Sequence, residues 1–320
     1  MIWQELTKKS PFFVLAPMDD VTDSVFRRVV AECAKPDLFF TEFVSVDGLN
    51  SPGRDALWKK LEFIAELETP LIVQVWGLKP DNYYKISKEL TGMGFAGIDI
   101  NMGCPAPVVT KNGGGSALIK DKVLAGEIIQ ATIDGVASAS KGVPVSVKTR
   151  LGFDKIDLSW PEYLMSFDIK ALTLHGRTTK EMSKVPNHWD KIGDVVKIRD
   201  KIAPELTIVG NGDVLTRAQG VELSEQWGVD GIMVGRGIFQ NPYLFDEGTD
   251  WAGIDKTDKI ALYKKHIKLF LDFWDNKKNP ASLKKFAKVY VNGFAGASED
   301  RAGLMECSTA EELLDRLNVL

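Results

Sequence analysis

The sequence predicts a (β/α)8 TIM barrel followed by a small C-terminal bundle of helices. Eight short apolar runs recur over the first 240 residues, at intervals that fit one strand and one helix each. The runs are rich in Val, Ile and Leu and do not alternate strictly with polar residues, which is typical of parallel strands covered on both faces. Eight such units predict a closed barrel, whose chemistry lies at the carboxyl ends of its strands.

Each run has the length of a strand and ends near a glycine, a proline or a polar residue. Most intervals between strand ends are about 30 residues, as one strand and its helix require. The interval after the fourth run is longer and opens with a polar, glycine-rich stretch at 108–116, for which we expect a mobile loop over the site. The predicted strands are 12–17, 38–44, 71–77, 97–103, 143–150, 171–176, 206–212 and 231–237.

Near residue 245 the strand pattern stops and helical periodicity begins. Ile260, Tyr263, Ile267, Phe270 and Trp274 fall on one face of a predicted helix. We therefore expect a barrel domain over 1–244 and a helical domain over 245–320.

Composition is that of a cytoplasmic enzyme. Hydrophobic residues make up 44% of the 320 positions, enough for a full core. The three cysteines form neither a metal-binding spacing nor a disulfide framework, so no metal is expected. No apolar run suggests a membrane span, and the first one reads as a strand and not as a signal peptide. We expect a monomer.

Lysines are concentrated in the predicted helical domain. Residues 259–288 carry nine lysines and two aspartates, a local charge of +7 in a chain of net charge −4. Lys264, Lys265 and Lys268 are either the solvated face of an amphipathic helix or part of a surface that follows a phosphate backbone. Composition alone leaves both interpretations open.

Cys104 follows the fourth predicted strand, between Gly103 and Pro105. Free cysteines are usually small buried hydrophobes, which is our interpretation of Cys33 and Cys307. At the end of a barrel strand, however, the thiol points toward the mouth. Since no base stands nearby in sequence to make it a nucleophile, and a thiol with a pKa near ~8.5 is mostly protonated at neutral pH, we expect Cys104 to donate a proton.

The ends of the last four strands predict a phosphorylated cofactor. Glycines after strands seven and eight leave backbone N–H groups accessible to a phosphate, and Lys148 suits a ring that becomes anionic on reduction. Gln74, on strand three, offers an amide to the edge of such a ring. Together these features suggest FMN. The strand-end residues are Lys148 and Arg150, His175 and Arg177, Asn211, Gly212 and Asp213, and Gly235 and Arg236.

Over nearly its whole length the chain resembles the tRNA-dihydrouridine synthase family. The resemblance is carried by a series of motifs in one order, and the lysine-rich tail matches the family's RNA-binding helical domain in position. These motifs are Ala16-Pro17-Met18 with Val21-Thr22-Asp23, residues 74–77, 101–105, 148–150, 175–177 and 211–213, and Gly235-Arg236-Gly237 with Asn241-Pro242.

The resemblance implies an FMN enzyme that reduces the C5–C6 double bond of a uridine in tRNA, with NADPH as reductant. It implies that Cys104 is the general acid and that Asn101 holds the uracil. The remaining implied roles are flavin contacts for Lys148, His175, Gln74, Pro17 and Met18, ribityl and phosphate contacts for Asn211, Gly212, Asp213, Gly235 and Arg236, flavin or RNA contacts for Arg150 and Arg177, and RNA contacts for Lys264, Lys265 and Lys268.

Three alternatives remain at this point. An FMN enzyme of a free pyrimidine, similar to dihydroorotate dehydrogenase, would share the barrel and the cysteine but would not require the lysines. A non-catalytic tRNA-binding protein would not need Cys104, Lys148 and His175. A flavin-free barrel that binds a sugar phosphate would leave Cys104 idle. Asp19 and Asp20, which depart from the family pattern, are expected to face solvent, and His188 to have a surface or packing role.

Overall fold

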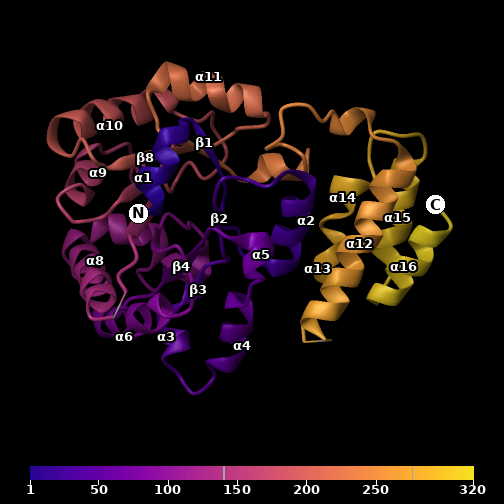
Figure 1. The fold of residues 1–320 in the computed structure, drawn as a ribbon, viewed down its shortest axis with the longest axis horizontal. Coiled ribbons are helices and arrows are strands. Elements are labelled where there is room, and N and C mark those ends of the chain that lie inside the picture. The colour runs from indigo at the N-terminus through magenta and orange to yellow at the C-terminus, as the bar shows by residue number, and fades with distance from the viewer. Residues whose placement is uncertain (140, 276) are drawn as a thin grey trace. The chain divides into compact units, whose positions relative to one another are not determined.

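A computed structural model describes residues 1–139, 141–275 and 277–320 (Figure 1). The chain divides into two compact units. The first consists of Met1–Ser24 and Pro36–Gly235, and the second of Val25–Lys35 and Arg236–Leu320. Both units are interrupted in sequence, because one helix near the N-terminus belongs to the second.

The first unit is a closed parallel barrel. Its strands follow the order β1-β9-β8-β7-β6-β5-β4-β2, and a parallel bridge between Val14 and Leu38 joins the two ends of this sheet. The (β/α)8 prediction is therefore confirmed. The strands are β1 (Phe12–Leu15), β2 (Phe39–Phe40), β3 (Val44–Ser45), β4 (Leu71–Trp76), β5 (Gly97–Met102), β6 (Val145–Arg150), β7 (Ala171–His175), β8 (Thr207–Asn211) and β9 (Gly231–Val234).

Every predicted strand is present, but the second is broken into β2 and β3, which both pair with β4. The break has a local cause at Thr41. Its hydroxyl oxygen accepts the backbone N–H of Gln74 at 3.1 Å and donates to the carbonyl of Glu42 at 2.7 Å. A side chain thus takes one place in the ladder that a backbone carbonyl would fill.

Helices of the first unit lie around the strands (Figure 1). Pro80 occupies the first turn of α6, as its fixed φ favours. The helical elements are α1 (Ile2–Leu6), η1 (Thr7–Lys9), α3 (Val46–Leu49), α4 (Asp55–Trp58), η2 (Lys59–Leu61), α5 (Ala65–Glu68), α6 (Pro80–Thr91), α7 (Pro107–Thr110), η3 (Gly115–Lys120), α8 (Lys122–Ala137), α9 (Ser159–Leu164), α10 (Trp189–Ile202) and α11 (Arg217–Trp227).

The N-terminal helix α1 contributes to the barrel core. Trp3 and Leu6 are buried in one cluster with side chains of the strands, among them Phe12, Val14 and Val209. The rings of Trp3 and Phe12 lie 6.2 Å apart. The cluster joins side chains of several strands to α1, so this helix is part of the barrel core.

The second unit is helical and packs around aromatic side chains. Phe26 of α2 is fully buried, and its ring lies 4.9 Å from that of Phe286 and 6.1 Å from that of Phe239. The predicted apolar face of α12 is confirmed, since Ile260, Tyr263, Ile267, Phe270 and Trp274 are all buried. The elements of this unit are α2 (Ser24–Ala34), η4 (Arg236–Phe239), η5 (Trp251–Gly253), α12 (Lys256–Trp274), α13 (Ala281–Lys284), α14 (Ala287–Tyr290), α15 (Ala297–Glu306) and α16 (Ala310–Asn318).

Among the helices formed by the described residues, none combines the length and the hydropathy that a bilayer crossing demands.

Candidate active site

Predicted site residues of the first unit converge at the carboxyl ends of neighbouring strands. The strand register sets Gln74 beside Asp99, Asn101 beside Lys148, and His175 between Arg150 and Asn211. Residues from β4, β5, β6, β7 and β8 therefore contribute to one cluster, at the place where barrels carry out their chemistry.

Cys104 stands just after β5 and is held by its backbone. The side-chain oxygen of Asn101 accepts the N–H groups of Gly103 at 3.1 Å and Cys104 at 2.9 Å. The carbonyl of Cys104 accepts the N–H of Ser116 at 3.0 Å. The residue is half-buried, and burial raises the pKa of its thiol above the ordinary value. The thiol is therefore protonated at neutral pH, as proton donation requires.

The glycine-rich stretch after Cys104 contacts that residue directly. Gly115 adopts φ +56°, and a Cβ there would lie 2.7 Å from the carbonyl oxygen of Cys104. This close approach explains a glycine at that position. The stretch includes α7 and the start of η3, with Val109 buried, while the expected mobility of the loop stays a prediction.

Arg150 links two segments that flank the thiol. Its Nε donates to the carbonyl of Gly103 at 2.8 Å, and its Nη1 donates to the carbonyls of Thr178 at 3.0 Å and Met182 at 3.2 Å. The side chain is 6% exposed. These three bonds tie the segment that carries Cys104 to the segment that follows β7.

Lys148 provides an ammonium group inside the cluster. Its Nζ donates to Oδ1 of Asn211 at 3.0 Å, and Asn211 Nδ2 donates in turn to the carbonyl of Met233 at 2.8 Å. Burial, with a smaller contribution from Arg150, lowers the pKa of Lys148 to about 8. The ammonium is thus charged at neutral pH but poorly compensated, so an anionic or acceptor-rich ligand would stabilise it.

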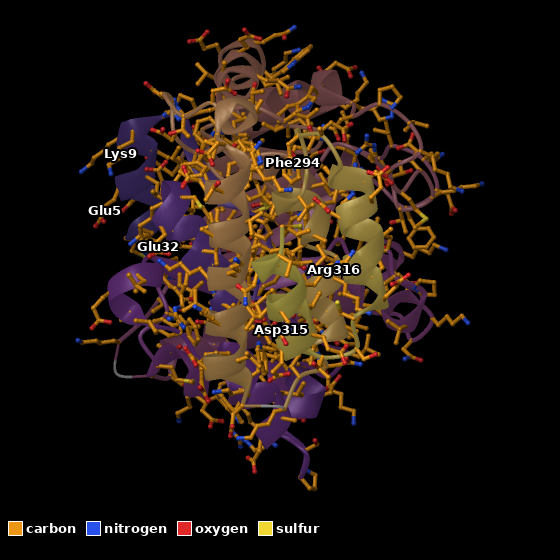
Figure 2. All side chains as sticks on the ribbon, turned by 90° about the vertical axis from the view of Figure 1, so that its right-hand side faces the viewer. Glu5, Lys9, Glu32, Phe294, Asp315 and Arg316 are labelled. Atoms are coloured by element: carbon orange, nitrogen blue, oxygen red, sulfur yellow. The ribbon has the colours of Figure 1, made fainter. Side chains whose placement is uncertain are left out.

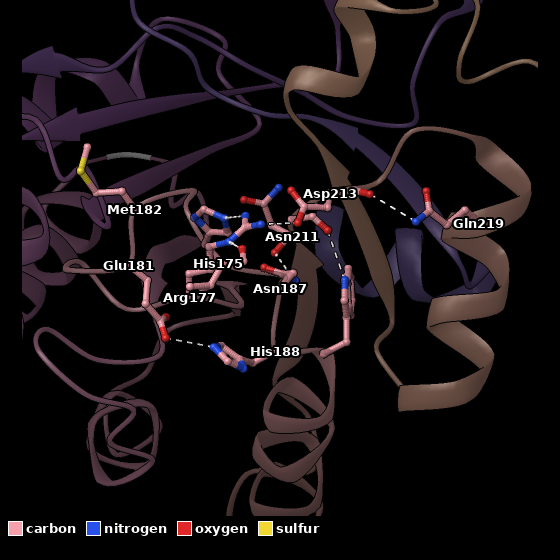
Figure 3. Close-up of polar contacts among 12 residues, drawn as sticks. His175, Arg177, Glu181, Met182, Asn187, His188, Asn211, Asp213 and Gln219 are labelled. Atoms are coloured by element: carbon pink, nitrogen blue, oxygen red, sulfur yellow. Dashed lines mark hydrogen bonds and ion pairs between the residues drawn. The ribbon is translucent and has the colours of Figure 1, made fainter.

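His175, Arg177 and Asp213 form a second polar group beside Asn211 (Figure 3). Arg177 is ion-paired with Asp213, and its Nη1 lies 3.3 Å from His175 Nε2. A guanidinium has no acceptor, so Nε2 of His175 accepts and the imidazole proton is on Nδ1.

Gly212 follows β8 with φ +133°, a conformation that side chains rarely adopt. A Cβ at this position would lie 2.2 Å from Oδ1 of Asn187, whose Nδ2 donates to the carbonyl of Asn211 at 3.3 Å (Figure 3). Asn187 was not predicted to be a site residue. It stands in a segment that has no counterpart among the quoted motifs, and no signal in the sequence distinguishes it.

Asp99 is a second residue that sequence analysis missed. It is fully buried on β5, where its carboxylate accepts from Ser146 Oγ at 2.6 Å and from Gln74 Nε2 at 2.7 Å. Burial raises the pKa of Asp99 to about 6. A polar residue two positions before Asn101 on an apolar strand was the available signal, because the same face of a strand recurs every second residue.

Predicted residues at β1 and β9 lie together in the first unit. A Cβ on Gly235 would be 4.0 Å from Sδ of Met18, and both Pro17 and Met18 are half-buried. Arg236 is exposed and opens η4, in the second unit. Lys264, Lys265 and Lys268 also belong to that unit, and the roles expected of these four residues stay predictions.

Asp19 and Asp20 are exposed, in agreement with the prediction. Asp19 is ion-paired with Lys60 at 3.1 Å. His188 is half-buried and bonds through Nε2 to Glu181 Oε1 at 3.0 Å, next to the first turn of α10 (Figure 3).

Known proteins resemble the chain in both sequence and fold. It is 44% identical over 316 residues to "Probable tRNA-dihydrouridine synthase 2" of Bacillus subtilis (strain 168), which covers 97% of this chain and 94% of that protein. It is 45% identical over 315 residues to "Probable tRNA-dihydrouridine synthase" of Staphylococcus aureus (strain COL), with 97% and 92% covered.

Two solved structures share the barrel. Histamine dehydrogenase from Rhizobium sp. 4-9 matches with a TM-score of 0.55 and 12% identity, over 80% of this chain and 48% of that chain. A morphinone reductase variant in complex with tetrahydroNAD matches with a TM-score of 0.50 and 12% identity, over 73% and 85%. At such identity the likeness supports the fold alone.

The family model described as dihydrouridine synthase (Dus) matches residues 14–320. That range begins within β1 and contains the rest of the barrel, Cys104 with its loop, and the helices of the second unit. The chain belongs to the dihydrouridine synthase family.

Proposed function

We propose that this protein is a tRNA-dihydrouridine synthase, a flavoenzyme that uses FMN and NADPH to reduce the C5–C6 bond of a uridine in tRNA. The observation that carries the proposal is a protonated, half-buried thiol at the end of β5, beside a cluster of hydrogen-bond donors, in a chain of this family. A tRNA substrate is consistent with action in the cytoplasm, and we propose that the protein acts as a monomer.

The residues of the cluster fit a flavin. Lys148 Nζ is a charged donor, which suits the acceptor-rich pyrimidine edge of the ring and the charge that develops there on reduction, and we propose that His175, at the end of β7, lies along the same edge. Thr173, which pairs with Lys148 across β6 and β7, has a buried hydroxyl with no hydrogen-bond partner among the described residues. A bound ligand would satisfy such a group.

The phosphate end has its own candidates. Gly212 and Gly235 follow adjacent strands, and neither carries a side chain to block approach to the backbone. With Asn211, Asp213 and Arg236, they are the residues that would hold the ribityl chain and phosphate.

In the proposed reaction Cys104 is the catalytic acid. A reduced flavin held by these residues would be the source of the hydride for C6 of uracil. Cys104 gives its thiol proton to C5, so that the double bond is saturated and a thiolate remains, which solvent reprotonates. Lys148 and Arg150 favour that thiolate electrostatically. Asn101, 5% exposed beside Cys104, is proposed to hold the uracil.

For the tRNA we propose the helical residues 245–320 as the binding domain. A stacked uridine must leave the RNA fold to reach a barrel, at a cost of a few kcal/mol that phosphate contacts can offset. The lysines are not equivalent, however. Lys265 is ion-paired with Glu32 of α2, which Figure 2 labels, whereas Lys268 is exposed and Lys264 half-buried. Lys259 is 1% exposed, under the ring of Trp251.

The decisive experiment maps dihydrouridine in tRNA from cells that lack this gene and then carry it again. We expect wild type to restore one or more dihydrouridines and Cys104→Ala to restore none while still binding FMN and tRNA. Cys33→Ala, which changes a cysteine of α2, is the matched control and should restore the modification. Normal modification by Cys104→Ala would refute the acid assignment, and unchanged tRNA in the deletion strain would refute the function.

A further inference from the structure

A continuous chain of hydrogen bonds runs from a buried carboxylate to the backbone of Cys104. Ser146 Oγ and Gln74 Nε2 donate to the two oxygens of Asp99. Asn101 Nδ2 donates to Gln74 Oε1 at 3.0 Å, and Asn101 Oδ1 accepts the N–H groups of Gly103 and Cys104. Asp99 and Gln74 are fully buried, and Asn101 is 5% exposed.

The direction of these bonds is fixed at both ends. An ionised Asp99 can only accept, so Gln74 must turn its N–H₂ toward it and its oxygen toward Asn101. Backbone N–H groups can only donate, so Asn101 must turn its oxygen toward Gly103 and Cys104. The two amides would otherwise be free to rotate by 180°, since their O and N atoms are nearly isosteric.

We propose that Asp99 is a positioning residue, which acts through Gln74 and Asn101 to hold the loop that carries the thiol of Cys104. The same hydrogen bonds determine which group of the Asn101 amide remains available to a ligand. Because both lone-pair directions of its oxygen are used by the loop, Asn101 keeps one N–H, so the uracil edge it meets must be an acceptor. In this respect the inference rests on the proposed function and deepens it.

The first test measures the loop alone, in apoprotein without flavin or RNA. We would follow alkylation of Cys104 by iodoacetamide at fixed pH, with peptide mass spectrometry to separate the three cysteines. Asp99→Leu removes the acceptor at similar volume and should make Cys104 react several-fold faster. Cys33 and Cys307 lie in the second unit and serve as internal reporters of general unfolding, so their rates should not change.

A pair of substitutions tests the direction of the bonds. Gln74→Glu alone places two carboxylates in contact and should free the loop as Asp99→Leu does. Combined with Asp99→Asn, it restores every bond. The amide now at position 99 donates to the carboxylate now at position 74, and that carboxylate accepts from Asn101. The double variant should return Cys104 alkylation toward the wild-type rate, a coupling that a packing role of Asp99 does not predict.

Asp230→Asn is the matched control. Asp230 also accepts two hydrogen bonds, from Arg199 Nη1 at 2.8 Å and the N–H of Ile208 at 2.7 Å, but it precedes β9, at the other end of the strands. Its substitution should leave Cys104 alkylation unchanged. The proposal is overturned if Asp99→Leu folds and alkylates at the wild-type rate, or if the double variant alkylates as fast as Gln74→Glu.

The second test measures uridine reduction. Misplacement of the acid should lower the rate of dihydrouridine formation by Asp99→Leu about tenfold or more. Its KM for tRNA should stay near that of wild type, since tRNA is held elsewhere. If alkylation responds as expected while wild type reduces no uridine, the positioning inference stands and the proposed function fails. A lowered affinity for tRNA with an unchanged rate would contradict the inference.

Discussion

Replacing Asp99 by asparagine should stabilise the protein at neutral pH. The carboxyl is fully buried, and burial raises its pKa from 3.8 to about 6. A shift of this size corresponds to about 3 kcal/mol, at 1.36 kcal/mol for each pKa unit. The folded state thus disfavours the ionised form by that amount, a penalty that hydrogen bonds from Ser146 and Gln74 only reduce.

The sign follows from proton linkage. Because the folded pKa lies above the unfolded one, the folded state binds more protons between pH 3.8 and about 6. Stability from this group is complete below pH 3.8 and is lost as pH rises through about 6. An asparagine side chain does not titrate, and it can still accept from Gln74 and donate to Ser146, so the variant should escape this loss.

The assay compares the melting temperatures of wild type and Asp99→Asn at pH 4 and pH 7. From pH 4 to pH 7, the stability of the variant relative to wild type should rise by up to about 3 kcal/mol, or roughly 5 °C or more in melting temperature. Ser146→Ala should act in the opposite direction, since it removes a bond that favours the carboxylate. A melting difference between Asp99→Asn and wild type that is the same at both pH values would refute the reasoning.

Three other predictions concern parts of the molecule outside this carboxylate. Gly212→Ala should lower FMN affinity and stability, because φ +133° and the 2.2 Å approach to Asn187 leave no place for a Cβ. Flavin titration and thermal melting measure the two effects, and a variant with wild-type values in both would contradict the prediction. Phe26→Ala should lower the free energy of unfolding by about 3–5 kcal/mol and reduce hydrogen-exchange protection in the second unit. An equal loss of protection in the barrel would contradict this prediction. Lys268→Gln should weaken tRNA binding and its salt dependence more than Lys265→Gln, whose charge Glu32 offsets; equal effects in filter binding at two salt concentrations would argue against this.

Much of the barrel was predictable because each strand is a local apolar run. Residues 71–75, for example, are apolar at all positions but Gln74 and are buried on both faces of the sheet, so their composition indicates a parallel strand. The break at Thr41 was not predictable, because it depends on a hydrogen bond to Gln74, which lies 33 positions away in the chain. Local composition does not predict hydrogen bonds between residues so far apart in the chain.

In the site, too, some residues could be identified from the sequence, whereas contacts between distant segments could not. Cys104, Lys148 and His175 could be found from their places at strand ends, and family resemblance supplied their roles. The bonds of Arg150 to Gly103, Thr178 and Met182 could not be found, because they depend on how two loops meet. Asp99 could have been found, because it stands two positions before Asn101 and therefore on the same face of β5, but its hydrogen bonds to Ser146 and Gln74 depend on two other strands.

The membership of α2 in the second unit affects how the protein is made. Phe26 leaves the ribosome more than 200 positions ahead of Phe239 and Phe286, the rings against which it packs. During that interval Phe26 lacks these aromatic partners, so the nascent chain carries an incompletely packed α2 while the rest of the barrel is still being translated. Chaperone binding to nascent chains should therefore persist until about residue 290 has emerged, and a chain that stops at Gly235 should aggregate.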